Sequence, residues 1–383
     1  MSVTAPQGFR AAGVAAGLKT SGLDVALVVN EGPAAAAAGV FTSNRVKAAP
    51  VLWSQQVLRA GVVRAVVLNS GGANACTGPQ GFQDTHATAE HAAAALGGIG
   101  AADVAVCSTG LIGELLPMDR LLLGVDAAAG ALAFDGGPAD AEAIMTTDTR
   151  PKTVVVRKDG WSVGGMAKGA GMLAPGMATM LCVLTTDAVA SAEALDAALR
   201  AATRITFDRV DSDGCMSTND TVLLLSSGAS SVEPSQEELT AAVTAACHDL
   251  AQQLLADAEG ATKDVAVEVV GAASEDDAVE VGRSVARNNL VKTALFGNDP
   301  NWGRILAAVG TTAAAFEPDA LDVAVNGVWV CKGGAAADDR STVDLSGRAV
   351  TIRIDLHAGA DEATIWTNDL SHAYVHENSA YST

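Results

Sequence analysis

Two hydrophobic periodicities alternate along this chain and predict a mixture of strands and helices. Short apolar runs rich in valine at 24–29, 64–68 and 104–107 are typical of buried strands. Apolar residues that recur at three- and four-residue intervals predict helices instead, because this spacing places them on one helical face. Helices are predicted at 82–96, 117–132, 139–145, 192–203, 235–257 and 274–287.

The remaining apolar segments predict a hairpin and a C-terminal group of strands. Segments 153–157 and 161–163 flank a Lys-Asp-Gly turn, which is typical of a β-hairpin. A further strand is expected at 180–186, and residues 1–60 should alternate short strands with turns. Antiparallel strands are predicted near the C-terminus at 322–325, 328–331, 350–355 and 363–366. The length of 383 residues allows two domains or one large layered domain.

Charge and hydropathy narrow the classes of partner. The net charge of −20 argues against binding nucleic acid or an anionic membrane surface. No apolar run reaches the roughly 18 residues that a membrane-spanning helix needs. The N-terminus shows no basic region ahead of an apolar run, so no secretory signal is expected. We therefore expect a soluble, cytoplasmic protein that contacts neither membranes nor nucleic acid.

The cysteines and histidines are dispersed and form no pattern typical of a metal site. The six cysteines include no C-x-x-C pair and most lie in apolar segments, which predicts reduced, buried thiols. The six histidines lack the H-E-x-x-H spacing of a zinc site. Neither a metal nor another cofactor is expected.

A glycine-dense stretch, KGAGMLAPGMATMLC at 168–182, leads into the strand expected at 180–186. Glycines that allow positive φ and close backbone approach lie in and before it, at Gly164, Gly165, Gly169, Gly171 and Gly176. Thr179 lies where the loop meets the strand. Its hydroxyl could attack the Ala178 carbonyl and cut the chain, which would free a threonine whose own α-amine serves as its base. The alternative is a glycine-rich hairpin in which Thr179 only occupies a strand position.

Three other polar segments follow predicted strands or helices. STGLIG at 108–113 exposes N–H groups and a hydroxyl after a strand, as an oxyanion hole requires, although a plain tight turn also fits. MTTDT at 145–149 makes either a polar pocket wall or a helix cap. Glu259 follows the long helix at 235–257, where the helix dipole disfavours a carboxylate. It is either a solvated end residue or a ligand for a substrate ammonium group.

Seven segments, in order along nearly the whole chain, resemble the ornithine acetyltransferase family of arginine biosynthesis. They are NSGGANACTG at 69–78, STGLIG at 108–113, MTTDT at 145–149, KGAGMLAPGMATML at 168–181, EGATK at 259–263, DPNWGR at 299–304 and NSAYST at 378–383. Two departures stand out. Gly176 occupies a position that is usually Asn in the family, and DGCMSTND at 213–220 has Cys-Met where a more polar pair is usual.

The resemblance implies a fold, a processing event and a set of site residues. The fold is an α/β layered sandwich of sheets and helices, shared with some self-cleaving aminopeptidases. Cleavage between Ala178 and Thr179 would give fragments 1–178 and 179–383, with the nucleophile Thr179 first in the second fragment. Two copies of each fragment would form a heterotetramer. The implied oxyanion pair is Thr109 and Gly110, and the implied substrate ligands are Thr146, Lys168, Thr179, Glu259, Asn378 and Thr383.

The activity implied by the resemblance is a ping-pong acetyl transfer from N2-acetyl-L-ornithine to L-glutamate through an acetyl ester on Thr179. Some members of the family also use acetyl-CoA as the donor. Two alternatives remain open at this point. One is a self-processed threonine amidase or aminopeptidase in which water accepts the acyl group. The other is an uncleaved binding protein that retains an amino-acid pocket.

Overall fold

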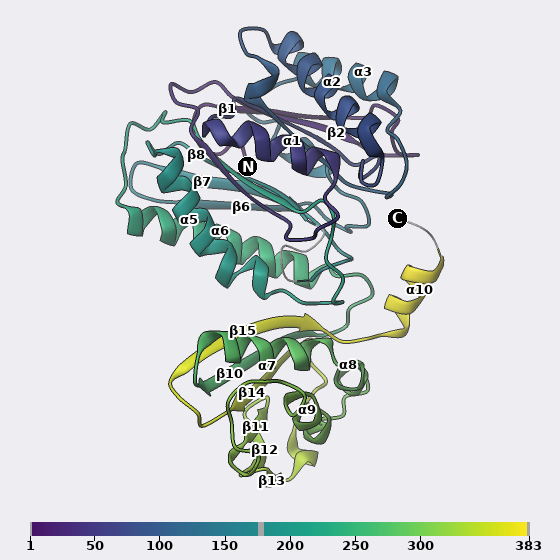
Figure 1. The fold of residues 1–383 in the computed structure, drawn as a ribbon, viewed down its shortest axis with the longest axis vertical. Helices are drawn as coiled ribbons and strands as arrows, with labels where there is room; N and C mark the ends of the chain where they lie inside the picture. Colours follow the sequence, from purple (N-terminus) through teal and green to yellow (C-terminus); the bar gives the residue numbers. More distant parts are fainter. Residues whose placement is uncertain (1, 175–179, 381–383) are drawn as a thin grey trace.

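A computed structural model describes residues 2–174 and 180–380 of the chain. Within these residues, two stacked sheets form an upper sandwich and a third sheet forms a smaller lower part (Figure 1). The predicted α/β fold of layered sheets and helices is confirmed. Among the described residues, no helix combines the length and apolar character needed to cross a membrane.

The first sheet of the sandwich has the order β1-β2-β4-β5, with β4 and β5 parallel. Its strands are β1 (Phe9–Val14), β2 (Val25–Asn30), β4 (Ala65–Asn69) and β5 (Val104–Ser108). Its outer face packs on α2 (Gly78–Leu96) and α3 (Met118–Gly130), at the top of Figure 1. The strands predicted from valine-rich runs are thus confirmed as buried sheet strands.

The second sheet has the order β3-β9-β8-β7-β6. Its strands are β3 (Ala37–Phe41), β6 (Lys152–Arg157), β7 (Ser162–Lys168), β8 (Leu181–Thr186) and β9 (Thr221–Ser226). Its outer face is covered by α5 (Ala192–Ile205) and α6 (Gln236–Ala256). Valine, leucine and methionine side chains from both sheets, among them Val66 and Met166, fill the space between them. The sandwich therefore has four layers, helix–sheet–sheet–helix.

The lower part is a six-stranded sheet with the order β13-β12-β11-β14-β10-β15. Its strands are β10 (Asp264–Ala272), β11 (Asp322–Val325), β12 (Val328–Lys332), β13 (Ala335–Ala336), β14 (Ala349–Asp355) and β15 (Asp361–Asn368). Its helices are α7 (Glu275–Arg287), α8 (Asn289–Phe296) and α9 (Trp302–Val309). The predicted antiparallel pairing is confirmed for β11 with β12 and β14, whereas β14 runs parallel to β10.

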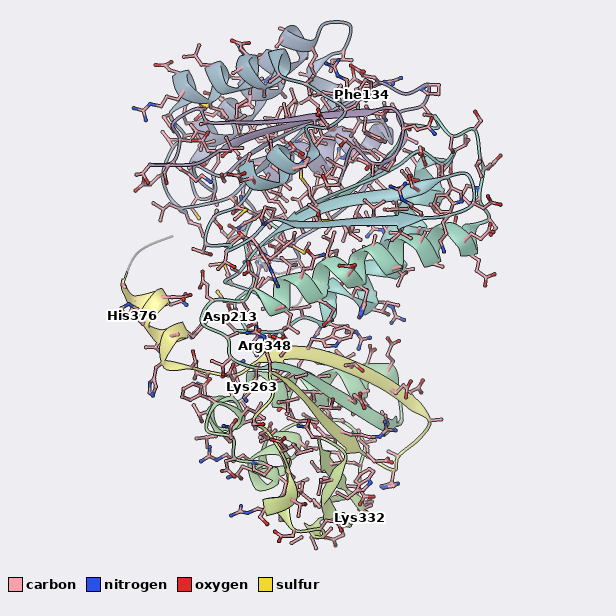
Figure 2. All side chains as sticks on the ribbon, turned by 180° about the vertical axis from the view of Figure 1, so that it is seen from behind. Phe134, Asp213, Lys263, Lys332, Arg348 and His376 are labelled. Carbon is pink, nitrogen blue, oxygen red and sulfur yellow. The ribbon has the colours of Figure 1, made fainter. Side chains whose placement is uncertain are left out.

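Arg348 ties the lower part to the end of α6. Its guanidinium pairs with Asp264 at 2.8 Å and donates to the Ala256 carbonyl at 2.8 Å. Figure 2 shows Arg348 and Lys263 where the two parts meet, with Asp213 above them. The last helix, α10 (His372–Ala380), leaves the lower part and returns toward the sandwich (Figure 1).

One helix within residues 1–60 was not predicted, and two further helices begin two or more residues before their predicted starts. The expectation of only strands and turns in residues 1–60 is wrong, because Ala49–Val57 forms helix α1 with a proline in its first turn. A short helix, α4 (Gly137–Ala143), begins and ends two residues earlier than the predicted 139–145. Helix α2 begins at Gly78, four residues before the predicted start. The expected buried thiols are confirmed for Cys107, Cys182, Cys247 and Cys331, whereas Cys76 and Cys215 are exposed.

Candidate active site

Six of the predicted site residues line one cavity of about 120 Å³ in the sandwich. They are Thr109, Gly110, Thr146, Lys168, Glu259 and Asn378. The walls come from the ends of β5 and β7, the loop after α4, the turn after α6, and α10. The other predicted residues, Ala178, Thr179 and Thr383, lie outside the described residues. The fold thus gathers into one cavity residues that are distant in the sequence.

Thr109 and Gly110 form the turn directly after β5. The Thr109 N–H donates to the Asn69 carbonyl at 3.0 Å, so the hydroxyl is the Thr109 donor left for a ligand. Gly110 has a φ of +129°, and a Cβ atom there would lie 2.9 Å from the backbone of Gly72. Both the left-handed backbone and the lack of space require glycine at this position.

Lys168, the last residue of β7, is buried and only 1% exposed. Its Nζ donates to Thr109 Oγ1 at 3.2 Å, which brings a cation beside the turn after β5. Burial lowers the pKa of Lys168 below its usual value, and the nearby carboxyl groups of Asp148 and Glu259 oppose this effect. Because desolvation favours the neutral amine, the charge of Lys168 depends on these carboxylates.

Glu259 lines the same cavity as Lys168. Its N–H donates to the Ala170 carbonyl at 2.9 Å, which fixes the turn after α6 to the loop after β7. A Cβ atom on Gly171 would lie 2.5 Å from Glu259 Oε2. Glycine at 171 therefore leaves the space that the Glu259 carboxylate occupies. The described lining of the cavity thus includes one basic and one acidic side chain.

Helix α10 is docked on the turn that carries Glu259. Gly260 has a φ of +62°, and a Cβ atom there would lie 2.2 Å from the Tyr374 backbone nitrogen. Ser371 Oγ donates to the Gly260 carbonyl at 2.5 Å and accepts the Tyr374 N–H at 3.0 Å. One helical turn beyond Tyr374, Asn378 is exposed and lines the cavity. The tight contact at Gly260 therefore brings Asn378 to the site.

Asn219 is a cavity residue that the sequence analysis did not identify. It lies in the turn before β9 and is 5% exposed. Its side-chain amide donates to the Ala73 carbonyl at 2.6 Å and to the Ser108 carbonyl at 2.7 Å. It joins the loops that follow β4 and β5 and holds the turn that carries Thr109. The signal available in the sequence was the polar run at 213–220 directly before a buried strand.

Asp220, next to Asn219, is a fully buried carboxyl group directly before β9. It accepts the Met180 N–H at 3.0 Å, so it holds the residue that follows Thr179 in the sequence. Burial raises the pKa of Asp220 well above its usual range, and this effect outweighs the opposing effects of the Met180 N–H and the Lys168 charge. The surroundings of Asp220 therefore favour its neutral form more than water does.

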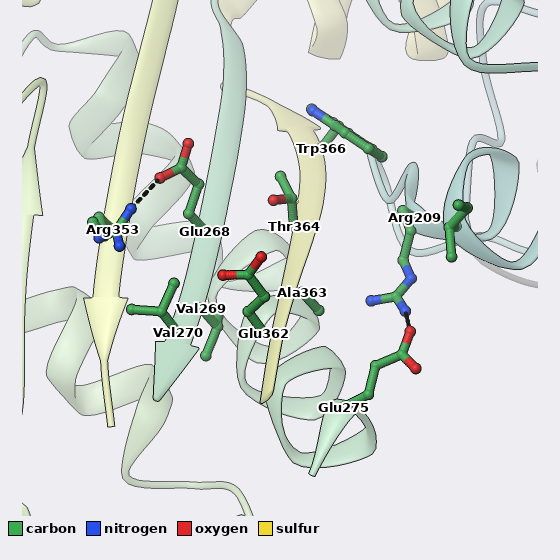
Figure 3. A pocket seen from close by; sticks show the side chains of 11 residues that line it. Arg209, Glu268, Val269, Val270, Glu275, Arg353, Glu362, Ala363, Thr364 and Trp366 are labelled. Atoms are coloured by element: carbon green, nitrogen blue, oxygen red, sulfur yellow. Dashed lines mark hydrogen bonds and ion pairs between the residues drawn. The ribbon is translucent and has the colours of Figure 1, made fainter. Parts of the chain in front are cut away.

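A larger cavity of about 430 Å³ lies on the lower sheet and contains none of the predicted site residues. Figure 3 shows two ion pairs among its charged side chains, with Glu362 between them. Arg353 pairs with Glu268 at 3.3 Å, and Arg209 pairs with Glu275. Both basic side chains of this cavity are therefore already paired, and we assign the candidate active site to the smaller cavity, which contains the predicted residues Lys168 and Glu259.

Comparison with known proteins places the chain in a family. The profile of the ArgJ family matches residues 10–383. The arginine biosynthesis bifunctional proteins ArgJ of Streptomyces avermitilis and Streptomyces coelicolor are 71% and 70% identical over 383 residues, covering 100% of each chain. An ornithine acetyltransferase from Mycobacterium tuberculosis, solved in complex with ornithine, is 63% identical over 47% of this chain and 96% of that chain, with a TM-score of 0.45. The chain belongs to the ArgJ family.

Proposed function

We propose that this protein transfers an acetyl group from N2-acetyl-L-ornithine to L-glutamate through an acetyl ester on Thr179. The broader class, an acetyltransferase enzyme of arginine biosynthesis, follows from membership of the ArgJ family. The observation that carries the finer proposal is the cavity in which Lys168, Glu259 and the Thr109 hydroxyl converge. A zwitterionic amino acid needs such a pair of opposite charges beside a polar donor.

The proposed nucleophile is generated by self-cleavage between Ala178 and Thr179. The Thr179 hydroxyl adds to the Ala178 carbonyl, the acyl group moves from nitrogen to oxygen, and water hydrolyses the resulting ester. The freed α-amine has a pKa of about 7.7–8.0, so a useful fraction is neutral near pH 7. Leu181, two residues after Thr179 in the sequence, pairs in register with Lys168, which lines the cavity. The position of Thr179 in the sequence therefore supports its proposed role as the nucleophile.

Acetyl transfer then proceeds in two half-reactions. The Thr179 Oγ attacks the acetyl carbonyl while the Thr179 amine takes the hydroxyl proton. The Thr109 hydroxyl and the Gly110 N–H stabilise the negative oxygen of the tetrahedral intermediate. Collapse expels ornithine, whose amine takes the proton back from the Thr179 ammonium. The amine of glutamate attacks the acetyl-threonine ester by the same steps in reverse, which releases N-acetylglutamate and regenerates Thr179.

One cavity serves both substrates because both are α-amino acids with a polar side-chain end. Lys168 supplies the cation for a substrate carboxylate, and Glu259 supplies the anion for a substrate ammonium group. Thr146 and Asn378, which also line the cavity, provide further polar contacts. Thr383 completes the proposed substrate ligands. Acetyl-CoA is a second possible acetyl donor in this scheme, and no further cofactor takes part.

The two fragments would remain folded together after cleavage. Strands β3, β6 and β7 come from residues 1–178, and β8 and β9 come from residues 179–383, yet all five share one sheet. The proposed assembly contains two copies of each fragment.

A denaturing mass spectrum of the intact protein after incubation with N2-acetyl-L-ornithine tests the proposal. Two species that divide at 178/179, with one acetyl group on the C-terminal species, are expected. A single full-length species without an adduct would contradict both the processing and the covalent mechanism, and would favour an uncleaved binding protein. Adding L-glutamate should remove the acetyl group as N-acetylglutamate, whereas free acetate as the main product would favour an amidase.

A further inference from the structure

A buried ionic cluster lies beside the cavity without lining it. Lys152, the first residue of β6, is 0% exposed, and its Nζ lies 2.5 Å from Asp148 Oδ1 and 2.6 Å from Asp257 Oδ2. Burying three charged groups is costly unless they are paired and hydrogen-bonded. The mechanism of acetyl transfer assigns no role to this cluster, so its position needs another explanation.

Asp148 connects two walls of the cavity through backbone groups. Its Oδ2 accepts the N–H of Thr146 at 3.0 Å, in the loop after α4. Its Oδ1 accepts the N–H of Gly169 at 2.7 Å, directly after Lys168 at the end of β7. One carboxylate thus holds the backbone at or next to two proposed substrate ligands.

Asp257 extends the same cluster to the third wall. It ends helix α6 and lies two residues before Glu259. One of its oxygens accepts the Thr149 N–H at 3.0 Å, and the other accepts the Thr149 hydroxyl. The loop at 146–149 is therefore fixed at both ends, by Asp148 and by Asp257, with Lys152 between the two carboxylates.

The cluster also determines the charge balance around Lys168. The charged or titratable groups that face Lys168 are Asp148, Lys152, Asp220 and Glu259. Burial disfavours the charged form of Asp148, yet Lys168, Lys152 and the Gly169 N–H together lower its pKa below the usual value. Burial raises the pKa of Asp220 well above its range. Asp148 is thus a buried neighbour of Lys168 whose charged form the cluster favours.

We propose that Asp148 is a positioning residue that sets the places of Thr146 and Lys168 and supplies the counter-charge for the Lys168 ammonium. Lys152 and Asp257 hold Asp148 in place. This inference rests on the proposed function, which makes Lys168 the ligand of the substrate carboxylate. Asp148 favours the charged form of Lys168, and Lys152 disfavours it. Removing Asp148 should therefore move the alkaline loss of ligand binding to lower pH, and removing Lys152 should move it to higher pH.

The test is calorimetric binding of L-ornithine to the full-length protein over a series of pH values. For Asp148→Asn we expect affinity about tenfold lower near neutral pH, with the loss of binding at alkaline pH moved down by about one unit. For Lys152→Gln we expect the alkaline loss of binding to move up. The titration of ornithine itself affects the binding curves of wild type and variants equally, so it does not contribute to the differences between them.

The matched control is Asp187→Asn, at a residue that directly follows β8 and bonds to Ser162, the first residue of β7. Asp187 is 3% exposed and accepts the N–H groups of Ser162 at 2.7 Å and Gln7 at 3.0 Å, so it resembles Asp148 in burial and bonding. Its replacement should lower stability without changing the pH dependence of ornithine binding. A comparable pH shift in this control would mean that loss of any buried carboxylate suffices, and would overturn the proposal.

Opposite shifts in the Asp148 and Lys152 variants would support the inference, and a destabilised fold alone cannot produce them. Superimposable curves for wild type, Asp148→Asn and Lys152→Gln would overturn it while leaving the proposed function intact. If Asp148→Asn does not fold, the upward shift in Lys152→Gln decides the question by itself. A wild-type protein that binds no ornithine would instead contradict the proposed function.

Discussion

A single methyl group would disturb the contact between Gly171 and Glu259. The carboxylate lies where a Cβ atom on residue 171 would stand, 2.5 Å from Oε2. The backbone at Gly171 does not have a positive φ, so alanine is compatible with the local conformation. Substitution at this position therefore acts on the placement of Glu259 more than on folding.

For Gly171→Ala we expect acetyl transfer on the order of a hundredfold slower, because a displacement of about 1 Å at a reacting site has that effect. The unfolding midpoint should change little. Steady-state kinetics and urea unfolding measure the two quantities. Gly303→Ala is the control, since the nearest atom to a Cβ there is 3.7 Å away and α9 is remote from the cavity. Unchanged kinetics in Gly171→Ala would contradict the placement of Glu259.

Asp140 in α4 provides a test of stability against pH. It is 0% exposed, and burial raises its pKa well above the usual range, despite the opposing effect of the Leu27 backbone. A carboxyl group with a raised pKa in the folded state favours folding at low pH. That contribution is lost as the pH rises through the folded-state pKa.

For Asp140→Asn we therefore expect stability close to wild type in acid. The variant should become more stable than wild type by about 1–3 kcal/mol as the pH rises, because the amide cannot ionise. Urea unfolding at several pH values measures the difference. A difference in the free energy of unfolding that does not change with pH would show that Asp140 is not titrating in the folded protein.

The site residues divide into those that local sequence reveals and those that it does not. Thr109 and Gly110 directly follow a valine-rich strand, and their small side chains already indicate a donor-rich turn. Asn219 gives no such signal, because an asparagine in a polar turn is common in any protein. Its role depends on carbonyls at Ala73 and Ser108, more than 100 residues away in the sequence.

At the level of elements, apolar periodicity predicted α5 and α6, and both helices begin after a serine cap. Ser235 Oγ accepts the Glu238 N–H at 3.2 Å, and the Glu238 carboxylate accepts the Ser235 N–H at 2.9 Å, which together form a capping box. Helix α10 has no buried residue and no apolar face, so periodicity could not reveal it. Its place is set by a tertiary contact with Gly260.

Gly260→Ala should displace α10 and remove Asn378 from the cavity. The added methyl group would lie 2.2 Å from the Tyr374 nitrogen, and the φ of +62° adds backbone strain of about 1 kcal/mol. We expect ornithine affinity about tenfold lower, as for loss of a substrate hydrogen bond of about 1.4 kcal/mol. Calorimetry measures the affinity, and limited proteolysis after residue 370 reports release of the helix.

Gly327→Ala is the control for this prediction. Gly327 has a φ of +83°, and no atom lies within 4 Å of a Cβ placed there. It lies in the turn between β11 and β12, on the lower part of the molecule. This variant should share the backbone strain but keep full ornithine affinity. An equal loss of affinity in both variants would attribute the effect to strain alone.

At the level of the whole molecule, the sequence predicted the strands and helices better than their assembly. Strand β3 pairs with β9, although Ala37 and Leu225 lie 188 residues apart in the sequence. Alternation of apolar residues specifies which face of a strand is buried, but not which strand lies beside it. The layered sandwich of sheets and helices was expected from the family resemblance alone, and the structure confirms it.

The same long-range pairing predicts the behaviour of the cleaved protein. Strands β7 and β8 pair antiparallel from Val163–Thr186 to Lys168–Leu181, on either side of the proposed cleavage point. Strand β3 joins β9 at the other edge of the pair β8 and β9, so each fragment is bound to the other on two sides. Apolar residues of both fragments, such as Val66 and Val183, also fill the core between the sheets.

We therefore expect fragments 1–178 and 179–383 to elute together in equal amounts under native conditions and to separate only on unfolding. Size-exclusion chromatography with light scattering, followed by a denaturing gel of the peak, measures this. Thr179→Ala, which lacks the cleaving hydroxyl, should remain one chain and elute at the same volume. Separate elution of the fragments would mean that the shared sheet and core do not outweigh the entropy gained by dissociation. Co-elution would show that the peptide bond at 178/179 is dispensable once the sandwich has formed.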